Sequence, residues 1–168
     1  IIKEQSKVEK IIKTENGFEC STADNQKYYC RSVLLAIGRR GTPRKLGVLG
    51  EEKEKVAYKI LEPELISEKN ILVVGGGDSA IETAILLAPQ NKVTLSYRSA
   101  TFSRLKPKNT AAINLAVENK LLNVIFDSNV QSIEGNEVIL TLNDKEGVTN
   151  LPNDLVYIFA GGELPTQF

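Results

Sequence analysis

The sequence predicts an α/β protein: a Rossmann-like, three-layer dinucleotide-binding domain with a β-meander crossover, preceded by a small antiparallel β-meander. Three observations support this fold class. A glycine-rich loop at residues 75–80 separates a short β-branched run from a stretch with helical spacing. Two alternating runs occupy residues 130–142, where a Rossmann fold would otherwise place a helix. Short β patterns and turn sequences alternate over the first 36 residues.

The composition excludes several kinds of chemistry. The 168 residues include no His, and 21 basic side chains balance 21 acidic ones. Without His, Ser-His-Asp and Cys-His catalysis and histidine metal sites are ruled out, so we expect no catalytic side chain and no metal site. A bound cofactor must supply the chemistry. Because the net charge is zero, we expect no nucleic-acid partner and no attraction to an anionic membrane.

The cysteines and the ends of the chain suggest where the protein works. Cys20 and Cys30 fit neither a CxxC redox pair nor a zinc ligand set, and we expect both to be reduced core residues. No run approaches the ~18 uncharged apolar residues of a membrane span, and no signal-peptide pattern is present. We therefore expect a cytoplasmic protein. The start at Ile1, without Met, and the end at Phe168 after a turn sequence predict a piece of a larger protein.

The pattern of the first region, up to about residue 38, predicts a small antiparallel meander whose last strand enters a larger sheet. Its β runs are expected around residues 8–12, 18–21 and 28–36. The apolar segment Ser32–Ile37 is typical of a strand that enters a buried sheet. Glycines and prolines between residues 39 and 52 mark a connection. We place a boundary there and assign residues 1–45 to a first domain and residues 46–168 to a second.

The second region follows a β-α-β pattern. A strand is predicted at residues 70–74, a helix from Asp78 to about Leu87 that Pro89 stops, and a strand at residues 92–97. The elements expected further along are a helix at 110–119, a strand at 123–126, a hairpin of 130–133 and 137–142, a possible strand at 145–150, and a closing strand at 155–159.

The glycine loop is the candidate phosphate site. It consists of Gly75, Gly76, Gly77, Asp78, Ser79 and Ala80. Gly75 is expected to permit the tight turn, Gly77 to let a pyrophosphate approach the backbone, and Ala80 to let the helix pack on the strands. The free amides and dipole of the helix N-terminus would face the phosphates, and Asp78 is expected to cap the same helix. The alternative is a glycine-rich turn without a ligand.

The residues after the second strand favour NADPH over NADH. An acid about 20 residues after the loop binds the ribose of NAD, whereas an arginine accepts the 2′-phosphate of NADP. No carboxylate occurs between Glu82 and Glu118, and Arg98 lies at the critical place with Arg104 and Lys106 nearby. A solvated loop is the alternative for this basic cluster. For Tyr97 the alternatives are stacking on the adenine and covering the sheet edge.

Several motifs resemble the NADPH domain of thioredoxin-reductase-like flavoproteins. VVGGGDSAIETA at 73–84 and YRSATFSR at 97–104 are similar to its glycine loop and phosphate motif, and 130–142 resembles its crossover. SVLLAIG at 32–38 is similar to the family's strand beside FAD, and AGGELP at 160–165 to its return strand.

The resemblance implies roles for residues outside the loop. Gly38 would border FAD, and Ala160 and Gly161 would belong to the nucleotide site. For Glu82 the alternatives are a place near the nicotinamide and a solvated position on the helix. In that family the NADPH domain is inserted within the FAD domain, which would make residues 1–45 part of the FAD half.

Two departures from the family pattern indicate which of its members the chain resembles more. No cysteine occurs at residues 56–70, where thioredoxin reductases carry a CxxC. The family's HRRxxFR motif keeps Arg98 and Phe102 here, has Ser99 for its second arginine, and shifts its last arginine to Arg104. The chain is therefore more similar to ferredoxin-NADP reductases of thioredoxin-reductase type and to bacillithiol-disulfide-reductase-like proteins.

The function implied is the NADPH-binding portion of a flavin-dependent oxidoreductase. NADPH would pass hydride to an FAD that only the full-length protein holds, so the fragment would be inactive alone. The electron acceptor, a protein or a small disulfide, stays open, as does a homodimeric state. The main alternative is a non-catalytic module that binds or senses NADP(H). A Rossmann methyltransferase is disfavoured, because it has no phosphate for Arg98 to meet.

Overall fold

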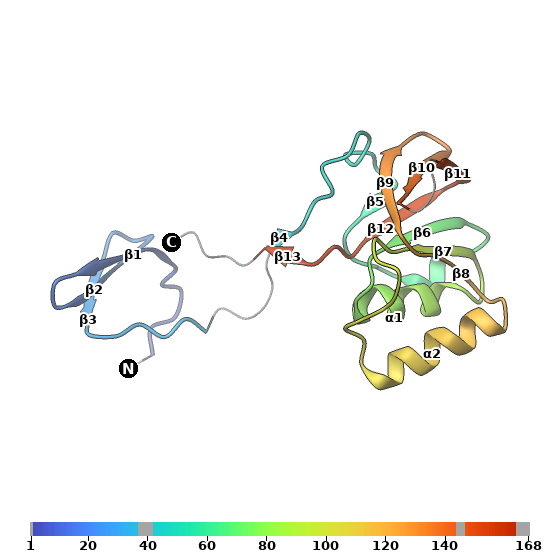
Figure 1. The fold of residues 1–168 in the computed structure, drawn as a ribbon. Coiled ribbons are helices and arrows are strands. Elements are labelled where there is room, and N and C mark those ends of the chain that lie inside the picture. The colour runs from blue at the N-terminus through green and yellow to red at the C-terminus, as the bar shows by residue number, and fades with distance from the viewer. Residues whose placement is uncertain (1, 37–41, 144–146, 164–168) are drawn as a thin grey trace. The chain divides into compact units, whose positions relative to one another are not determined.

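The structure is a computed structural model that describes residues 2–36, 42–143 and 147–163. The chain divides into two compact units, unit 1 with Ile1–Thr42 and Glu163–Phe168, and unit 2 with Pro43–Gly162 (Figure 1). No helix in the described ranges is long and apolar enough to span a membrane.

Unit 1 contains the antiparallel meander that the sequence predicts. Its strands β1 (Val8–Thr14), β2 (Gly17–Thr22) and β3 (Lys27–Cys30) pair in the order β1-β2-β3 (Figure 1). Gly17 has φ +146°, and a Cβ there would lie 2.2 Å from the Cys30 carbonyl oxygen. Only glycine fits this turn between β1 and β2.

The third run of unit 1 ends earlier than the sequence predicts. The expected strand Ser32–Ile37 is wrong for its described part, since β3 ends at Cys30 and residues 32–36 have no regular secondary structure. The side chain of Leu34 is 91% exposed. A buried strand needs neighbours that satisfy its backbone and cover its apolar side chains, and no described strand pairs with residues 32–36. Ile37 lies outside the described residues.

Unit 2 is built on a parallel sheet of five strands. In spatial order they are β5 (Val56–Ala57), β12 (Leu155–Ile158), β6 (Asn70–Val74), β7 (Lys92–Ser96) and β8 (Asn123–Ile125). The last of these strands in the sequence, β12, pairs with both β5 and β6. It therefore lies inside the sheet, and its carboxyl end comes beside the glycine loop that follows β6.

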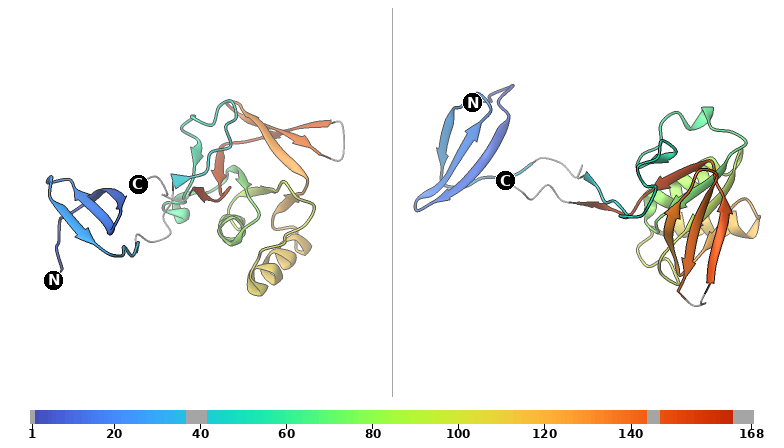
Figure 2. Two further views of the ribbon diagram at one scale, coloured as in Figure 1. Left: turned by 60° about the vertical axis from the view of Figure 1, so that its left-hand side comes forward. Right: turned by 90° about the horizontal axis from the view of Figure 1, so that it is seen from above.

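Unit 2 has the predicted three layers (Figures 1 and 2). A hydrophobic core lies on each face of the parallel sheet. Helices α1 (Asp78–Leu87) and α2 (Pro107–Glu118) cover one face of the sheet. An antiparallel meander covers the other, with β9 (Ser128–Ile133), β10 (Glu137–Leu142) and β11 (Gly147–Pro152). Alternate residues of β6 serve the two cores: Ile71 and Val73 pack with the helices, and Leu72 packs with the meander.

Several boundaries differ from the sequence prediction. Helix α2 begins at Pro107 rather than Thr110, because proline's fixed φ and missing N–H suit the first helical position. The possible strand at 145–150 is β11, whose described part starts at Gly147. The two-residue strand β5 is too short to leave a pattern in the sequence. Outside the main sheet, β4 (Thr42–Pro43) pairs with β13 (Gly162–Glu163), and a 3-10 helix covers Pro63–Leu65.

A buried carboxylate, Glu51, stabilises the irregular segment at the start of unit 2 by hydrogen bonds. It accepts hydrogen bonds of 2.7 Å from the backbone N–H groups of Leu46 and Gly47 and from the Tyr58 hydroxyl. Burial opposes the charge, but these donors outweigh it and hold the pKa of Glu51 below its ordinary value of 4.5. Burial and the nearby carboxylate raise the pKa of Tyr58 to about 12.

Replacing Glu51 by glutamine is expected to lower the free energy of unfolding at pH 7 by about 1 to 3 kcal/mol, since backbone donors lose a charged acceptor. Because folding lowers the pKa of Glu51, its contribution is present above pH 4.5 and disappears as the pH falls through the lower folded value. Urea unfolding of both proteins at pH 7 and at pH 3 measures the difference. An equal loss at both pH values would contradict the role of the charge.

Candidate functional site

The glycine loop joins the carboxyl end of β6 to the start of α1. Gly75 has φ +141°, and a Cβ there would lie 2.5 Å from the Phe159 carbonyl oxygen and 3.3 Å from the Ala80 Cβ. Because Gly75 has no side chain, the end of β6 can pack closely against both Phe159, which follows β12, and helix α1. The tight turn expected at Gly75 and the close helix packing expected at Ala80 are both present, and Ala80 is completely buried.

Gly77 leaves open space at the start of α1. It is the N-cap residue, it is exposed, and a Cβ there would meet nothing within 4 Å. No side chain of the described residues caps the helix. The first N–H groups of α1, which include that of Ser79, thus face a free surface at the positive end of the helix dipole. This geometry suits an anion.

Asp78 does not cap α1, and that expectation is wrong. Asp78 is the first helical residue, whereas a capping side chain comes from the non-helical residue before it, which is Gly77. The Asp78 carboxylate instead accepts the backbone N–H of Lys106 at 3.0 Å and Asn109 Nδ2 at 2.7 Å. These two bonds lower the pKa of Asp78. Asp78 thereby joins α1 to the start of α2.

Glu82 takes part in the same connection. It is exposed one turn into α1, and its carboxylate accepts a hydrogen bond of 2.8 Å from Asn109 Nδ2. Asn109 is only 6% exposed and divides its two amide hydrogens between Asp78 and Glu82. Sequence reasoning missed Asn109, because only the fold brings the two helices together.

Tyr97 covers the glycine loop. A Cβ on Gly76 would lie 2.2 Å from its ring, so Gly76 is needed for this contact. The Tyr97 ring stacks on Phe102 with 5.5 Å between centroids, and Phe102 meets Phe126 edge-on at 4.9 Å. The ring thus packs on the glycine loop itself, and both expected roles of Tyr97, stacking on the adenine and covering the sheet edge, stay predictions.

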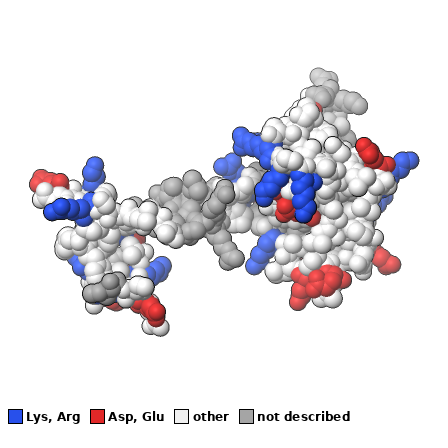
Figure 3. Space-filling model, turned by 90° about the horizontal axis from the view of Figure 1, so that it is seen from below, with Lys and Arg blue, Asp and Glu red and all other residues white. Residues whose placement is uncertain are grey.

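The basic residues after β7 lie on an open loop. Arg98, Arg104 and Lys106 are exposed, and none of them forms an ion pair with another described residue. Ser99 is half-buried, and its carbonyl accepts the Asp127 N–H at 3.3 Å. Figure 3 shows Lys and Arg side chains gathered around a small acidic spot on unit 2. Because Arg98, Arg104 and Lys106 are exposed, a soluble anion can reach them.

The remaining candidates follow β12. Ala160 is half-buried against the meander core, and Gly161 is exposed with φ +95°. The Gly161 carbonyl accepts the Arg44 N–H at 3.0 Å. Because β12 and β6 are parallel neighbours, both residues follow the same sheet edge as the glycine loop. Gly38 lies outside the described residues.

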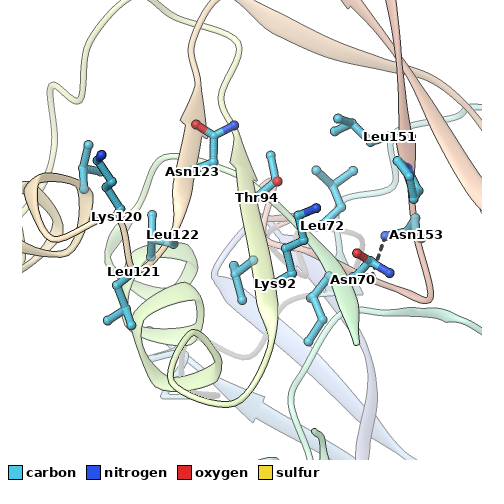
Figure 4. Close-up of a pocket in the computed structure, with 14 residues that line it drawn as sticks. Asn70, Leu72, Lys92, Thr94, Lys120, Leu121, Leu122, Asn123, Leu151 and Asn153 are labelled. Carbon is cyan, nitrogen blue, oxygen red and sulfur yellow. Dashed lines mark hydrogen bonds between the residues drawn. The ribbon is translucent and has the colours of Figure 1, made fainter. Parts of the chain in front are cut away.

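A cavity of about 470 Å³ lies at the opposite edge of the sheet (Figure 4). Asn70, Lys92 and Asn123, which begin β6, β7 and β8, line it together with Asn153. Ligands of open parallel sheets bind beyond the carboxyl ends of the strands. The cavity is therefore at the wrong edge for a dinucleotide.

The fold and the site define the class of protein. A parallel sheet with helices on one face and a meander on the other carries a glycine loop, an uncapped helix N-terminus and exposed arginines at its carboxyl edge. This is the Rossmann class of dinucleotide-binding folds.

Comparison with known proteins identifies the family. The family model described as pyridine nucleotide-disulphide oxidoreductase matches residues 1–168. The chain is 30% identical over 164 residues to a ferredoxin–NADP reductase of Ignicoccus hospitalis, covering 96% of this chain and 53% of that protein. It is 29% identical over 158 residues to the bacilliredoxin reductase Bdr of Bacillus subtilis, covering 93% and 48%.

A solved structure agrees. The bacillithiol disulfide reductase Bdr from Staphylococcus aureus matches with a TM-score of 0.82 and 26% identity over 95% of this chain and 49% of that one. The chain therefore belongs to the pyridine nucleotide-disulphide oxidoreductase family and is thioredoxin-reductase-like. The family uses FAD and NAD(P)H, and the relatives named here are oxidoreductases. The chain spans about half the length of these relatives.

Proposed function

We propose that this chain is the NADPH-binding portion of a flavin-dependent oxidoreductase that passes hydride from NADPH to FAD. The observation that carries the proposal is the free surface at Gly77. It combines an uncapped helix N-terminus with backbone that no side chain shields, beside an exposed arginine cluster. NADPH, when bound, supplies the hydride, and FAD in the full-length protein accepts it.

The residues of the chain hold and position the dinucleotide. The N–H groups at Gly77, Asp78 and Ser79 bind the pyrophosphate, and Arg98 binds the 2′-phosphate with help from Arg104. The Tyr97 ring packs against Gly76 and thereby stabilises the conformation of the loop. No acid or base is required, because hydride transfer depends on holding two rings in contact.

The organisation of the chain supports an inserted domain. Strands β4 and β13 pair with each other, so the chain enters and leaves unit 2 through adjacent strands. An inserted domain has this arrangement, because its two connections return to the same parent domain. On this proposal unit 1 belongs to the FAD half, and Gly38 borders the flavin. The electron acceptor is a protein such as ferredoxin or a small disulfide, as the names of the relatives suggest.

The cofactor preference is tested by calorimetric titration of the chain with NADPH and with NADH. Replacing Arg98 by alanine is expected to weaken NADPH binding by about 1.5 to 3 kcal/mol, roughly 10- to 150-fold, because a hydrogen bond to a charged group is lost. NADH, which lacks the 2′-phosphate, should lose far less. Equal affinities in the unchanged chain, or equal losses in the variant, would contradict the assignment of Arg98.

The redox part of the proposal is tested on the full-length protein. It should purify yellow, with flavin absorbance that NADPH bleaches in the absence of oxygen. A colourless protein that still binds NADPH would leave a module that binds or senses NADP(H) without turnover.

A further inference from the structure

Cys20 and Cys30 lie on adjacent strands of unit 1 and on one face of its meander. The register pairs Cys20 with Tyr28 and Phe18 with Cys30. Because side chains alternate between faces, Phe18, Cys20 and Cys30 share a face. The two cysteines are thus diagonal neighbours on one face of the meander.

Both cysteines are free thiols. Cys30 is exposed, which overturns the expectation that it is a core residue, and its thiol donates a long hydrogen bond of 3.9 Å to the Phe18 carbonyl. Cys20 is half-buried. Burial raises the pKa of the Cys20 thiol, and the neighbouring Cys30 side chain raises it further. The accessible Cys30 is therefore the first thiol that a reagent meets.

We propose that Cys20 and Cys30 form a reversible disulfide by exchange with a low-molecular-weight disulfide. The Cys30 thiolate attacks one sulfur of the reagent, forms a mixed disulfide and releases one thiolate. The Cys20 thiolate then attacks the Cys30 Sγ, which closes the protein disulfide and releases the second thiolate. The two protein thiols lose two protons and two electrons in total, and the reagent is reduced to two thiols.

The position of the pair explains why the bond is reversible. Diagonal neighbours have Cα atoms roughly 7–8 Å apart, whereas disulfides span roughly 4.4–6.8 Å. The right-handed twist brings one diagonal closer, and β3 is a four-residue edge strand paired only with β2 among the described strands. Closing the bond thus needs a small shift of an edge strand. Strained or exposed disulfides are the readily reduced ones.

The test uses the 168-residue chain and glutathione disulfide as the probe. The reduced chain is incubated with mixtures of glutathione and glutathione disulfide, and the reaction is quenched with an alkylating reagent. The mass of the intact protein is then measured by mass spectrometry. We expect both thiols to disappear together, little glutathione adduct, and full recovery with dithiothreitol. In Cys20→Ser the adduct on Cys30 should persist and be at least about tenfold more abundant, because no neighbouring thiol displaces it.

A matched control moves the outer thiol to the other face. Cys30→Ser combined with Tyr29→Cys keeps two cysteines at nearly the same separation along the sequence. Residue 29 is 71% exposed in the native chain. This variant should collect stable glutathione adducts on residue 29. Three results would each overturn the proposal: a lasting adduct on Cys30 in the unchanged chain, protein disulfides that form only between molecules, or the same intramolecular bond in the control. The outcome is independent of NADPH binding, which involves unit 2.

Discussion

Replacing Gly75 by alanine is expected to lower the free energy of unfolding of unit 2 by about 3 kcal/mol, one of the largest single-residue effects in the chain. The new Cβ would lie 2.5 Å from a backbone oxygen of Phe159, and backbone cannot move away as a flexible side chain can. The φ of +141° adds strain of its own. Urea unfolding followed by circular dichroism measures the loss.

Gly135→Ala is the matched control for this prediction. Gly135 lies in the turn between β9 and β10, and a Cβ there meets nothing within 4 Å. Its stability should stay within about 0.5 kcal/mol of the unchanged chain. If Gly75→Ala were as stable as Gly135→Ala, the close approach of β6 and the end of β12 would be wrong.

Replacing Gly77 by valine is expected to weaken NADPH binding by about 3 kcal/mol or more, over 100-fold, while the chain still folds. The side chain would enter free space rather than the protein, so it costs the native state little. It would cover the helix N–H groups and keep a phosphate away from them. Calorimetric titration with NADPH, together with urea unfolding, separates the two effects.

Gly75 and Gly77 therefore predict opposite results. Gly75→Ala should change stability first, and Gly77→Val should change affinity at nearly constant stability. Valine at Gly77 that leaves NADPH binding within about twofold would mean that the nucleotide does not approach the loop.

Much of unit 2 is predictable from the sequence because its signals are local. The turn at Gly75 and the small Ala80 follow from the requirements of a strand, a tight turn and a helix in succession. The apolar spacing of α1 and the alternation in β9 and β10 likewise depend on neighbours in the chain.

Other features depend on partners that only the fold supplies. Three such contacts join segments whose sequences give no sign that they meet. They are the Tyr97 ring over Gly76, the Asn109 amide between Asp78 and Glu82, and the hydrogen-bond donors around Glu51. The apolar run at residues 32–36 shows the reverse error. It has the composition of a buried strand, but no described strand covers it.

The most direct test of the nucleotide site is amide hydrogen exchange of the chain with and without NADPH. We expect slower exchange at Gly77, Asp78, Ser79 and the loop around Arg98, with no change around the cavity at the other edge of the sheet. Protection confined to that cavity, near Lys92 and Asn153, or no protection at a saturating concentration of NADPH, would contradict it.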